Sequence, residues 1–354
     1  MKIVAVVVVL AVIALSIWWI LPGQPRKVAV LVSAEYAESN VVLYDADFWY
    51  DTVLTYCALK ENGFADKDIY VLYGHGEDGF YLPDGGTQPS GAPALAANGT
   101  GEDYYMPPYC AGAVGDRGVR PITDFPMIYP ATGTGKKKDG TASRPRELLE
   151  CLANGCWAFT SAYGTIKPLG KRDFLYVWWK GHGYRPMSAP DSVSFTLPGL
   201  TSVTADEVVG WLAQVRAGRR VLVLETCHSG CLGTAIDTVD PPSILFASAG
   251  CGEISSNSYR PKGDVPHGVW TYWIDCNLQG KMPNPPIVPW ETGMSNALSV
   301  GKPLDHVFDQ SAKAVGRFIP SQTPLKKDEC ELAPRTTIHG PDPVGQTPVP
   351  CPPP

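Results

Sequence analysis

The chain has 354 residues, of which 44% are hydrophobic and 18% are charged, and its formal net charge at neutral pH is −6. This length is sufficient for one sizeable α/β domain. The acidic balance and the lack of a basic stripe argue against a nucleic-acid partner.

The chain begins with an apolar segment followed by a short linker. Residues 3–21 form an unbroken apolar run that is long enough to cross a bilayer, and Trp18 and Trp19 near its end suit the membrane interface. We therefore expect residues 1–25 to be a membrane anchor and linker. Flanking charges leave the orientation open, and the ten cysteines favour a location of the rest of the chain outside the cytoplasm. The alternative is a cleaved signal peptide and a secreted protein.

Strands and helices are predicted to alternate over residues 26–330. Short apolar runs indicate strands, and longer segments with start and stop signals indicate helices. Strands are expected at residues 28–33, 69–73, 173–180, 220–225 and 244–248, and helices at residues 47–62, 145–156, 204–217, 267–278 and 303–318. Thr204 and Glu207 have the spacing of a capping box. This order predicts an α/β fold with a mostly parallel sheet and helices on both faces.

Two segments interrupt this pattern. Residues 74–142 are rich in Gly, Pro and Tyr and are too long for an ordinary connection. We interpret them as an insertion into the 26–330 domain, serving as a lid, a cleft wall or a partner surface; disorder is the alternative. Residues 331–354 are rich in Pro and are expected to form an extended tail.

Two of the predicted strands end in reactive residues. The run LYVWWKGHG at residues 175–183 places His182 between two glycines, and the run RVLVLETCHSG at residues 220–230 contains Cys227. Apolar runs of this kind indicate strands buried on both faces, and sites in parallel sheets lie beyond the carboxyl ends of the strands. Both side chains are therefore expected at one rim, as a Cys–His nucleophile pair requires. The N–H groups of Gly183 and Cys227 are candidate oxyanion donors.

The structural alternative is that each motif has only a local role. A histidine between glycines can be a turn residue, and a buried cysteine at the end of a strand can be inert packing. A zinc site formed by His182, Cys227, His228 and Cys231 is a further alternative, but it lacks a second clean ligand pair. We therefore expect no metal and no cofactor.

These motifs resemble those of caspase/legumain-type cysteine peptidases. LYVWWKGHG is similar to the family's strand-then-histidine-glycine motif, and VLVLETCHSG is similar to its nucleophile motif. The opening strand–helix–strand unit also resembles that of legumain relatives, and His182 precedes Cys227 by 45 residues, near the offset of about 50 in caspase-type enzymes. The resemblance covers about residues 27–323 without the insertion.

The resemblance implies a caspase-like three-layer sandwich and a cysteine endopeptidase that cleaves peptide or protein substrates through a thioester. A transamidase would use the same pair of residues, and an inactive membrane-anchored scaffold would use neither. A zinc-dependent hydrolase would use the ligand set given above.

In this family, the end of the first strand and the start of the first helix help to line the substrate pocket. The residues at this place are Asp45, Asp47 and Asp51, and His228 and Ser248 are further pocket candidates. Carboxylates bind Lys and Arg side chains through charge-assisted hydrogen bonds, so cleavage after basic residues is predicted. The alternative is that Asp45 or Asp47 only caps the helix.

The ten cysteines suggest that disulfides accompany the free nucleophile. Removing one nucleophile leaves an odd number, so at least one more cysteine stays free or pairs with another chain. Cys110, Cys330 and Cys351 lie in expected loop or tail segments and are candidates for disulfides, whereas Cys57 falls on a predicted helix. The pairing cannot be read from sequence.

Overall fold

A computed structural model describes residues 25–34, 46–73, 103–105, 119–121, 128–129, 144–156, 165–197, 201–237, 239, 243–256, 268–279, 302–328 and 330–336. The apolar run at residues 3–21, most of the expected insertion and the end of the tail lie outside these residues. Among the helices that are described, none combines the length and the apolar character that crossing a bilayer requires.

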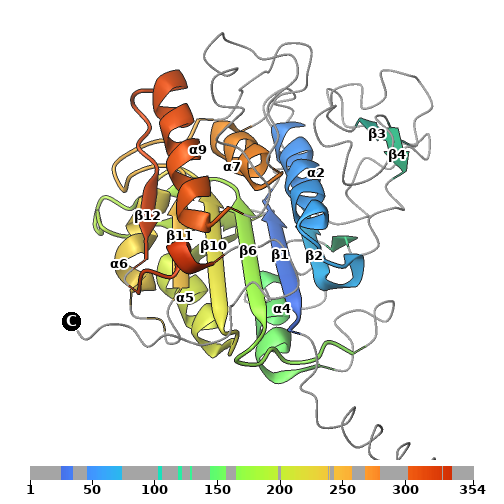
Figure 1. The fold of residues 1–354 in the computed structure, drawn as a ribbon. Helices are drawn as coiled ribbons and strands as arrows, with labels where there is room; N and C mark the ends of the chain where they lie inside the picture. The colour runs from blue at the N-terminus through green and yellow to red at the C-terminus, as the bar shows by residue number, and fades with distance from the viewer. Residues whose placement is uncertain are drawn as a thin grey trace, which may run out of the picture.

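A seven-stranded sheet forms the centre of the molecule, with the order β12-β11-β10-β6-β1-β2-β5 (Figure 1). All neighbouring strands are parallel except β11 and β12. The predicted α/β fold with a mostly parallel sheet is thereby confirmed. The strands are β1 (Lys27–Ser33), β2 (Ile69–Tyr73), β5 (Ile128–Tyr129), β6 (Phe174–Lys180), β10 (Arg219–Glu225), β11 (Ser243–Ala247) and β12 (Leu325–Lys327).

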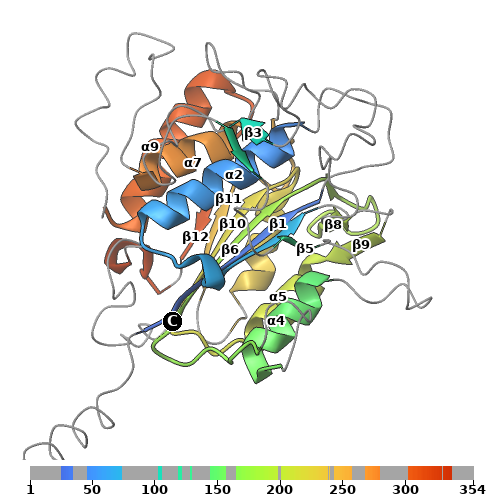
Figure 2. The same cartoon turned by 90° about the vertical axis from the view of Figure 1, so that its right-hand side faces the viewer.

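Helices cover both faces of this sheet (Figure 2). On one face, Phe174, Tyr176 and Trp178 of β6 belong to the same buried cluster as residues of three helices. On the other face, Leu175 and Trp179 belong to a second such cluster. Because both faces are covered, the central strands are apolar without alternation. The first face carries α2 (Ala46–Glu61), α7 (Val269–Gln279) and α9 (Leu304–Phe318), and the second carries α4 (Arg144–Asn154), α5 (Ala205–Gln214) and α6 (Leu232–Ile236).

Smaller elements complete the described structure. A three-stranded antiparallel sheet follows β6 directly, and a two-stranded sheet lies within the expected insertion. The insertion also contributes β5 to the main sheet, which the sequence pattern did not predict because a two-residue strand has no periodicity. The remaining elements are β3 (Asp103–Tyr105), β4 (Val119–Pro121), β7 (Gly183–Tyr184), β8 (Ser194–Leu197), β9 (Thr201–Thr204), and the 3-10 helices η1 (Asp66–Asp68), η6 (Ser229–Cys231) and η7 (Ala333–Arg335).

The packed part of the chain continues beyond the expected start of the tail at residue 331. Leu332 and Ala333 are buried in the core beneath α9, and the backbone N–H of Leu304 donates to the Thr336 carbonyl at 2.9 Å. The described end of the chain is therefore part of the folded domain.

The strand order fixes where a site can form. From β1, the chain adds β2 and β5 on one side and then returns to build β6, β10 and β11 on the other side. The reversal lies between β1 and β6, and crevices at such points bind ligands beyond the carboxyl ends of the strands. The register of β6 and β10 pairs Lys180 with Glu225. His182 and Cys227, each two residues further along, therefore leave the sheet at the same level.

Candidate functional site

Cys227 lies in a sharp turn between β10 and η6. The residue after it, His228, has a φ of 59° in the left-handed region, and this conformation redirects the chain into η6 and α6. The Cys227 side chain is half-buried, and its Sγ lies 3.9 Å from the Ser255 carbonyl oxygen, to which it donates. Of the cysteine side chains that the structure describes, Cys227 is the free one. The turn thus presents a thiol at the rim of the sheet.

The surroundings of Cys227 favour the neutral thiol. Burial raises the pKa of the Cys227 thiol, and backbone hydrogen bonds of Ser255, Cys227 and Gly183 to the sulfur lower this pKa by a smaller amount. A reaction of this sulfur at neutral pH therefore requires a base to remove its proton.

His182 follows β6 at the same rim. Its side chain is exposed, its carbonyl accepts a hydrogen bond from the Thr196 N–H at 2.9 Å, and its ring lies 5.9 Å from the ring of Phe48 in α2. No hydrogen bond joins the His182 ring to Cys227 Sγ among the described residues. Catalytic hydrogen bonds are often formed only when substrate is bound. The structure therefore brings His182 and Cys227 to one rim of the sheet, but no hydrogen bond joins their described side chains in this conformation.

Gly183 is the point of contact between the two loops. A Cβ atom at this position would lie 1.8 Å from the Cys227 carbonyl oxygen and 2.9 Å from its carbonyl carbon. Any larger residue would force the loops apart, so glycine is required here for close approach. The N–H groups of Gly183 and Cys227, the candidate oxyanion donors, accordingly both face the sulfur.

A network of buried charges lies beneath this rim. Lys180 at the end of β6 forms an ion pair with Asp51 of α2, and its Nζ lies 3.9 Å from Glu225 Oε2 at the end of β10. The Glu225 carboxylate also accepts from the backbone N–H groups of Trp270 and Thr271 at 3.2 and 3.1 Å. A carboxylate at the first turn of α7 is stabilised by the helix dipole. The network thus connects both site-bearing strands to α2 and α7.

The predicted pocket residues occupy different depths. Asp51 and Ser248 are completely buried, so neither side chain has a surface that a substrate can contact in this conformation. The Asp51 carboxylate is turned inward because it forms an ion pair with Lys180. The Ser248 hydroxyl is also turned inward, and its Oγ lies 3.3 Å from Ser229 Oγ. His228 is half-buried, and its Nδ1 lies 3.0 Å from the Cys251 carbonyl oxygen.

The other two pocket candidates are described less fully. Asp47 belongs to the first turn of α2, next to Phe48, whose ring lies 5.9 Å from the His182 ring. The side chain of Asp47 and the whole of Asp45 lie outside the described residues. The start of α2 therefore lies near the His182 ring, and a pocket role for Asp45 and Asp47 stays a prediction.

The disulfide pairing of the cysteines argues against the alternative of a zinc site that includes Cys231. Cys231 forms a disulfide with Cys251, so its sulfur is not available to the zinc ligand set considered above. No group of three or more His, Cys, Asp or Glu side chains in the described ranges is arranged to hold a metal ion. A second disulfide joins Cys151 and Cys156, and Cys330 is disulfide-bonded, as predicted.

Sequence reasoning missed the partners that surround the reactive pair. Ser255 contributes only its backbone, which no side-chain pattern can reveal. Lys180 and Glu225 had a signal, because each is a charged residue at the end of a strand buried on both faces, and such charges are almost always paired. Neither a scan against protein-family models nor a search of curated proteins finds a match for this chain.

Proposed function

We propose that this chain is a cysteine endopeptidase that hydrolyses peptide bonds, with Cys227 as the nucleophile and His182 as the general base. The observation that carries the proposal is the contact at Gly183, where the histidine loop touches the backbone of Cys227. This contact lies beyond the ends of two adjacent parallel strands, beside the strand-order reversal. The caspase-like sandwich belongs to the same proposal, and the helix layers on both faces of the sheet support it.

The proposed reaction begins with transfer of the thiol proton to the His182 imidazole. The Cys227 sulfur attacks the substrate carbonyl, and the negative charge on the carbonyl oxygen is stabilised by the N–H groups of Gly183 and Cys227. The protonated imidazole then gives its proton to the leaving amine, and a thioester remains. Water, deprotonated by the same imidazole, hydrolyses the thioester, and the proton returns to the sulfur. Because the resting thiol is neutral, the base is essential.

Specificity for a basic residue before the scissile bond stays part of the proposal. It depends on Asp45 and Asp47, because Asp51 is paired with Lys180 inside the protein. Membrane anchoring through residues 1–25, with the catalytic domain outside the cytoplasm, is proposed on the sequence pattern alone.

The test is hydrolysis of a peptide library by the wild type, Cys227→Ala and His182→Ala. We expect cleavage by the wild type, mainly after Lys and Arg, and a loss of kcat/KM of at least about 10³-fold in both variants. Cys57→Ala, at a cysteine of α2, is the matched control and should retain activity. Full activity in Cys227→Ala would refute the nucleophile, and cleavage only after Asp or Asn would refute the specificity. An added amine that becomes ligated to the product would indicate transamidation instead.

A further inference from the structure

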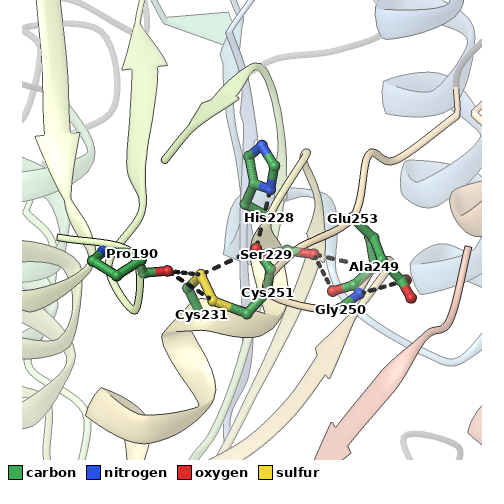
Figure 3. The surroundings of a disulfide bond; sticks show 8 residues. All are labelled: Pro190, His228, Ser229, Cys231, Ala249, Gly250, Cys251 and Glu253. Carbon is green, nitrogen blue, oxygen red and sulfur yellow. Dashed lines mark hydrogen bonds between the residues drawn. A yellow bond between two sulfur atoms is a disulfide. The ribbon is translucent and has the colours of Figure 1, made fainter. Parts of the chain in front are cut away.

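The disulfide between Cys231 and Cys251 joins two segments that form the surroundings of Cys227 (Figure 3). Cys231 lies in η6, four residues after the nucleophile, and Cys251 lies in the loop that follows β11. Pro190, in the connection between β7 and β8, has its carbonyl oxygen 3.6 Å from Cys251 Sγ. The disulfide is thus located where the histidine segment, the nucleophile segment and the loop after β11 meet.

The loop after β11 provides direct contacts to the nucleophile turn. Its Ser255 carbonyl accepts from Cys227 Sγ at 3.9 Å, and its Glu253 carbonyl accepts from the His228 N–H at 2.8 Å. The Cys251 carbonyl oxygen lies 3.0 Å from His228 Nδ1. These contacts all come from residues 251–256, which have no helix or strand. Their position therefore depends on how the loop is attached to the rest of the protein.

The disulfide is the covalent attachment of this loop. On the β11 side of Cys251, hydrogen bonds hold Ala249 to Gly230 at 2.9 Å and to Ser229 Oγ at 3.2 Å. Beyond Cys251, the Glu253 carboxylate accepts from the N–H groups of Gly250 and Thr323. Loss of the disulfide would leave these hydrogen bonds to hold the loop against solvent competition.

The disulfide is accessible to a reductant. Cys251 is partly exposed, whereas Cys231 is 4% exposed. Cys231 also lines a pocket of about 380 Å³, which Pro190 and the exposed Asp191 line with it. A thiol can therefore approach the Cys251 sulfur from solvent, and the pocket provides space for the Cys231 sulfur to move when the bond breaks.

We propose that the Cys231–Cys251 disulfide is a redox-modification site that controls the geometry of the Cys227 centre, and that a dithiol reductant switches the centre off. The thiolate of the dithiol attacks Cys251 Sγ, the disulfide breaks, and Cys231 leaves as a thiolate. The second thiol of the reductant then displaces Cys251. Two electrons pass from the dithiol, which becomes a disulfide, and its two protons go to Cys231 and Cys251. Reoxidation reverses the change.

Breaking the Cys231–Cys251 disulfide should change two measured properties of Cys227 in opposite directions: the alkylation rate should rise and the rate of catalysis should fall. Without the loop in place, Cys227 Sγ loses part of the burial that raises its pKa, which outweighs the lost backbone hydrogen bond of Ser255, so the sulfur becomes easier to reach and to alkylate. Catalysis should decrease, because a displacement of about 1 Å in a reacting group can lower the rate roughly 100-fold. The change in activity rests on the proposed function, but the change in alkylation does not.

The second disulfide of the described chain provides a matched control. Cys151 and Cys156 lie at the end of α4, and Cys156 pairs with Ile166 just before the chain enters β6. This is the end of the sheet where β6 begins, opposite the rim that carries His182. Its removal should leave the Cys227 centre unchanged.

The experiment compares the oxidised wild type with Cys231→Ser/Cys251→Ser and Cys151→Ser/Cys156→Ser, at a temperature where circular dichroism shows all three to be folded. Iodoacetamide labelling of the Cys227 peptide is followed by mass spectrometry, and kcat/KM is measured on a cleaved peptide. For the variant lacking the Cys231–Cys251 bond, we expect an alkylation rate at least threefold faster and a kcat/KM at least tenfold lower. The control should stay within twofold of wild type in both measurements.

Titration of the wild type with dithiothreitol gives the same test without substitution. Reduction of Cys231–Cys251 should reproduce both changes reversibly, while the variant that lacks this disulfide should not respond to the reductant. Equal alkylation rates in the oxidised and reduced wild type would overturn the proposal, as would a disulfide that dithiothreitol cannot reduce in the folded protein. If the wild type cleaves no peptide, the proposed function fails, and the alkylation rates still decide the redox proposal.

Discussion

At the residue scale, the site depends on one close approach. Gly183 lets the histidine segment contact the Cys227 backbone, and the N–H groups of both residues face the sulfur. His228 contributes by adopting a left-handed φ, which histidine tolerates better than most residues other than glycine, asparagine and aspartate. The geometry at this rim therefore depends on two backbone positions, a close approach at Gly183 that only glycine permits and a left-handed φ at His228.

Gly183→Ala tests this approach. The added Cβ would overlap the Cys227 carbonyl oxygen at 1.8 Å, so the two loops must separate. We expect the unfolding free energy to fall by about 1–3 kcal/mol and kcat/KM to fall roughly 100-fold, as measured by urea denaturation and peptide hydrolysis.

The matched control is Gly210→Ala in α5, where a Cβ would meet nothing within 4 Å. Alanine is the better helix former by about 1 kcal/mol, so this variant should be more stable and equally active. A Gly183→Ala variant that behaves like Gly210→Ala would show that the close contact is not required.

The position of His182 and Cys227 at one rim was predictable from sequence, but the partners around them were not. His182 and Cys227 follow long apolar runs, and parallel strands bring such positions to one rim. Asp51, by contrast, was expected in the pocket, but its partner Lys180 lies 129 residues away, and the pairing depends on how α2 packs on β6. The Cys231–Cys251 pairing likewise depends on the fold, because spacing alone does not fix connectivity.

At the element scale, long strands could be predicted from the sequence and short strands could not. The strands β1, β6 and β10 have seven residues each and are buried throughout, so their apolar runs are visible in the sequence. The strands β5 and β12 have two and three residues, which is too short for any pattern, and β12 contains two lysines. They were missed for this reason, as were the short strands after His182.

The start of α5 confirms a prediction made from a short sequence motif, the capping box of Thr204 and Glu207. The Thr204 side chain accepts from the Glu207 N–H at 3.3 Å, and the Glu207 carboxylate accepts from the Thr204 N–H at 2.8 Å. This reciprocal arrangement is the predicted capping box, which satisfies two N–H groups that the helix itself cannot.

Thr204→Ala should lower the unfolding free energy by about 1 kcal/mol, since it removes the acceptor for the Glu207 N–H. Thr204→Ser keeps the hydroxyl and should restore most of this loss. Urea denaturation measures both changes. Peptide hydrolysis should be unaffected, because the Thr204 hydroxyl forms its hydrogen bonds with Glu207 at the start of the same helix. Equal stability of Thr204→Ala and wild type would mean that the cap contributes nothing.

At the scale of the whole molecule, buried charges connect the sheet to one helix layer. Asp51 of α2, Lys180 of β6 and Glu225 of β10 meet beneath the site, and Asp275 of α7 lies in the same layer. Asp275 Oδ2 accepts from the Thr55 hydroxyl at 2.6 Å. The Lys180 ammonium therefore faces two carboxylates, and both of these are close enough to Asp275 to raise its pKa.

The surroundings of Asp275 favour its protonated form. Burial raises its pKa well above the usual value of 3.8, the Thr55 hydrogen bond offsets this in part, and the charges of Asp51 and Glu225 raise it further. In the unfolded chain, the same carboxyl group loses its proton near pH 4. Its contribution to stability is therefore fully present below about pH 4 and is lost as the pH rises toward the raised folded value.

Asp275→Asn replaces this carboxyl group with an amide that does not titrate. Between the unfolded and folded pKa values of Asp275, the wild type loses up to about 1.4 kcal/mol of unfolding free energy per pH unit through this group, and the variant does not. The free energy of unfolding of Asp275→Asn relative to wild type should therefore increase as the pH rises above about 4, as urea denaturation at each pH measures. Asp191→Asn, at an exposed position, is the matched control and should show a constant difference. A constant difference for Asp275→Asn as well would mean that Asp275 is ionised in the folded protein, and the charge balance beneath the Cys227 rim would have to include a second uncompensated carboxylate.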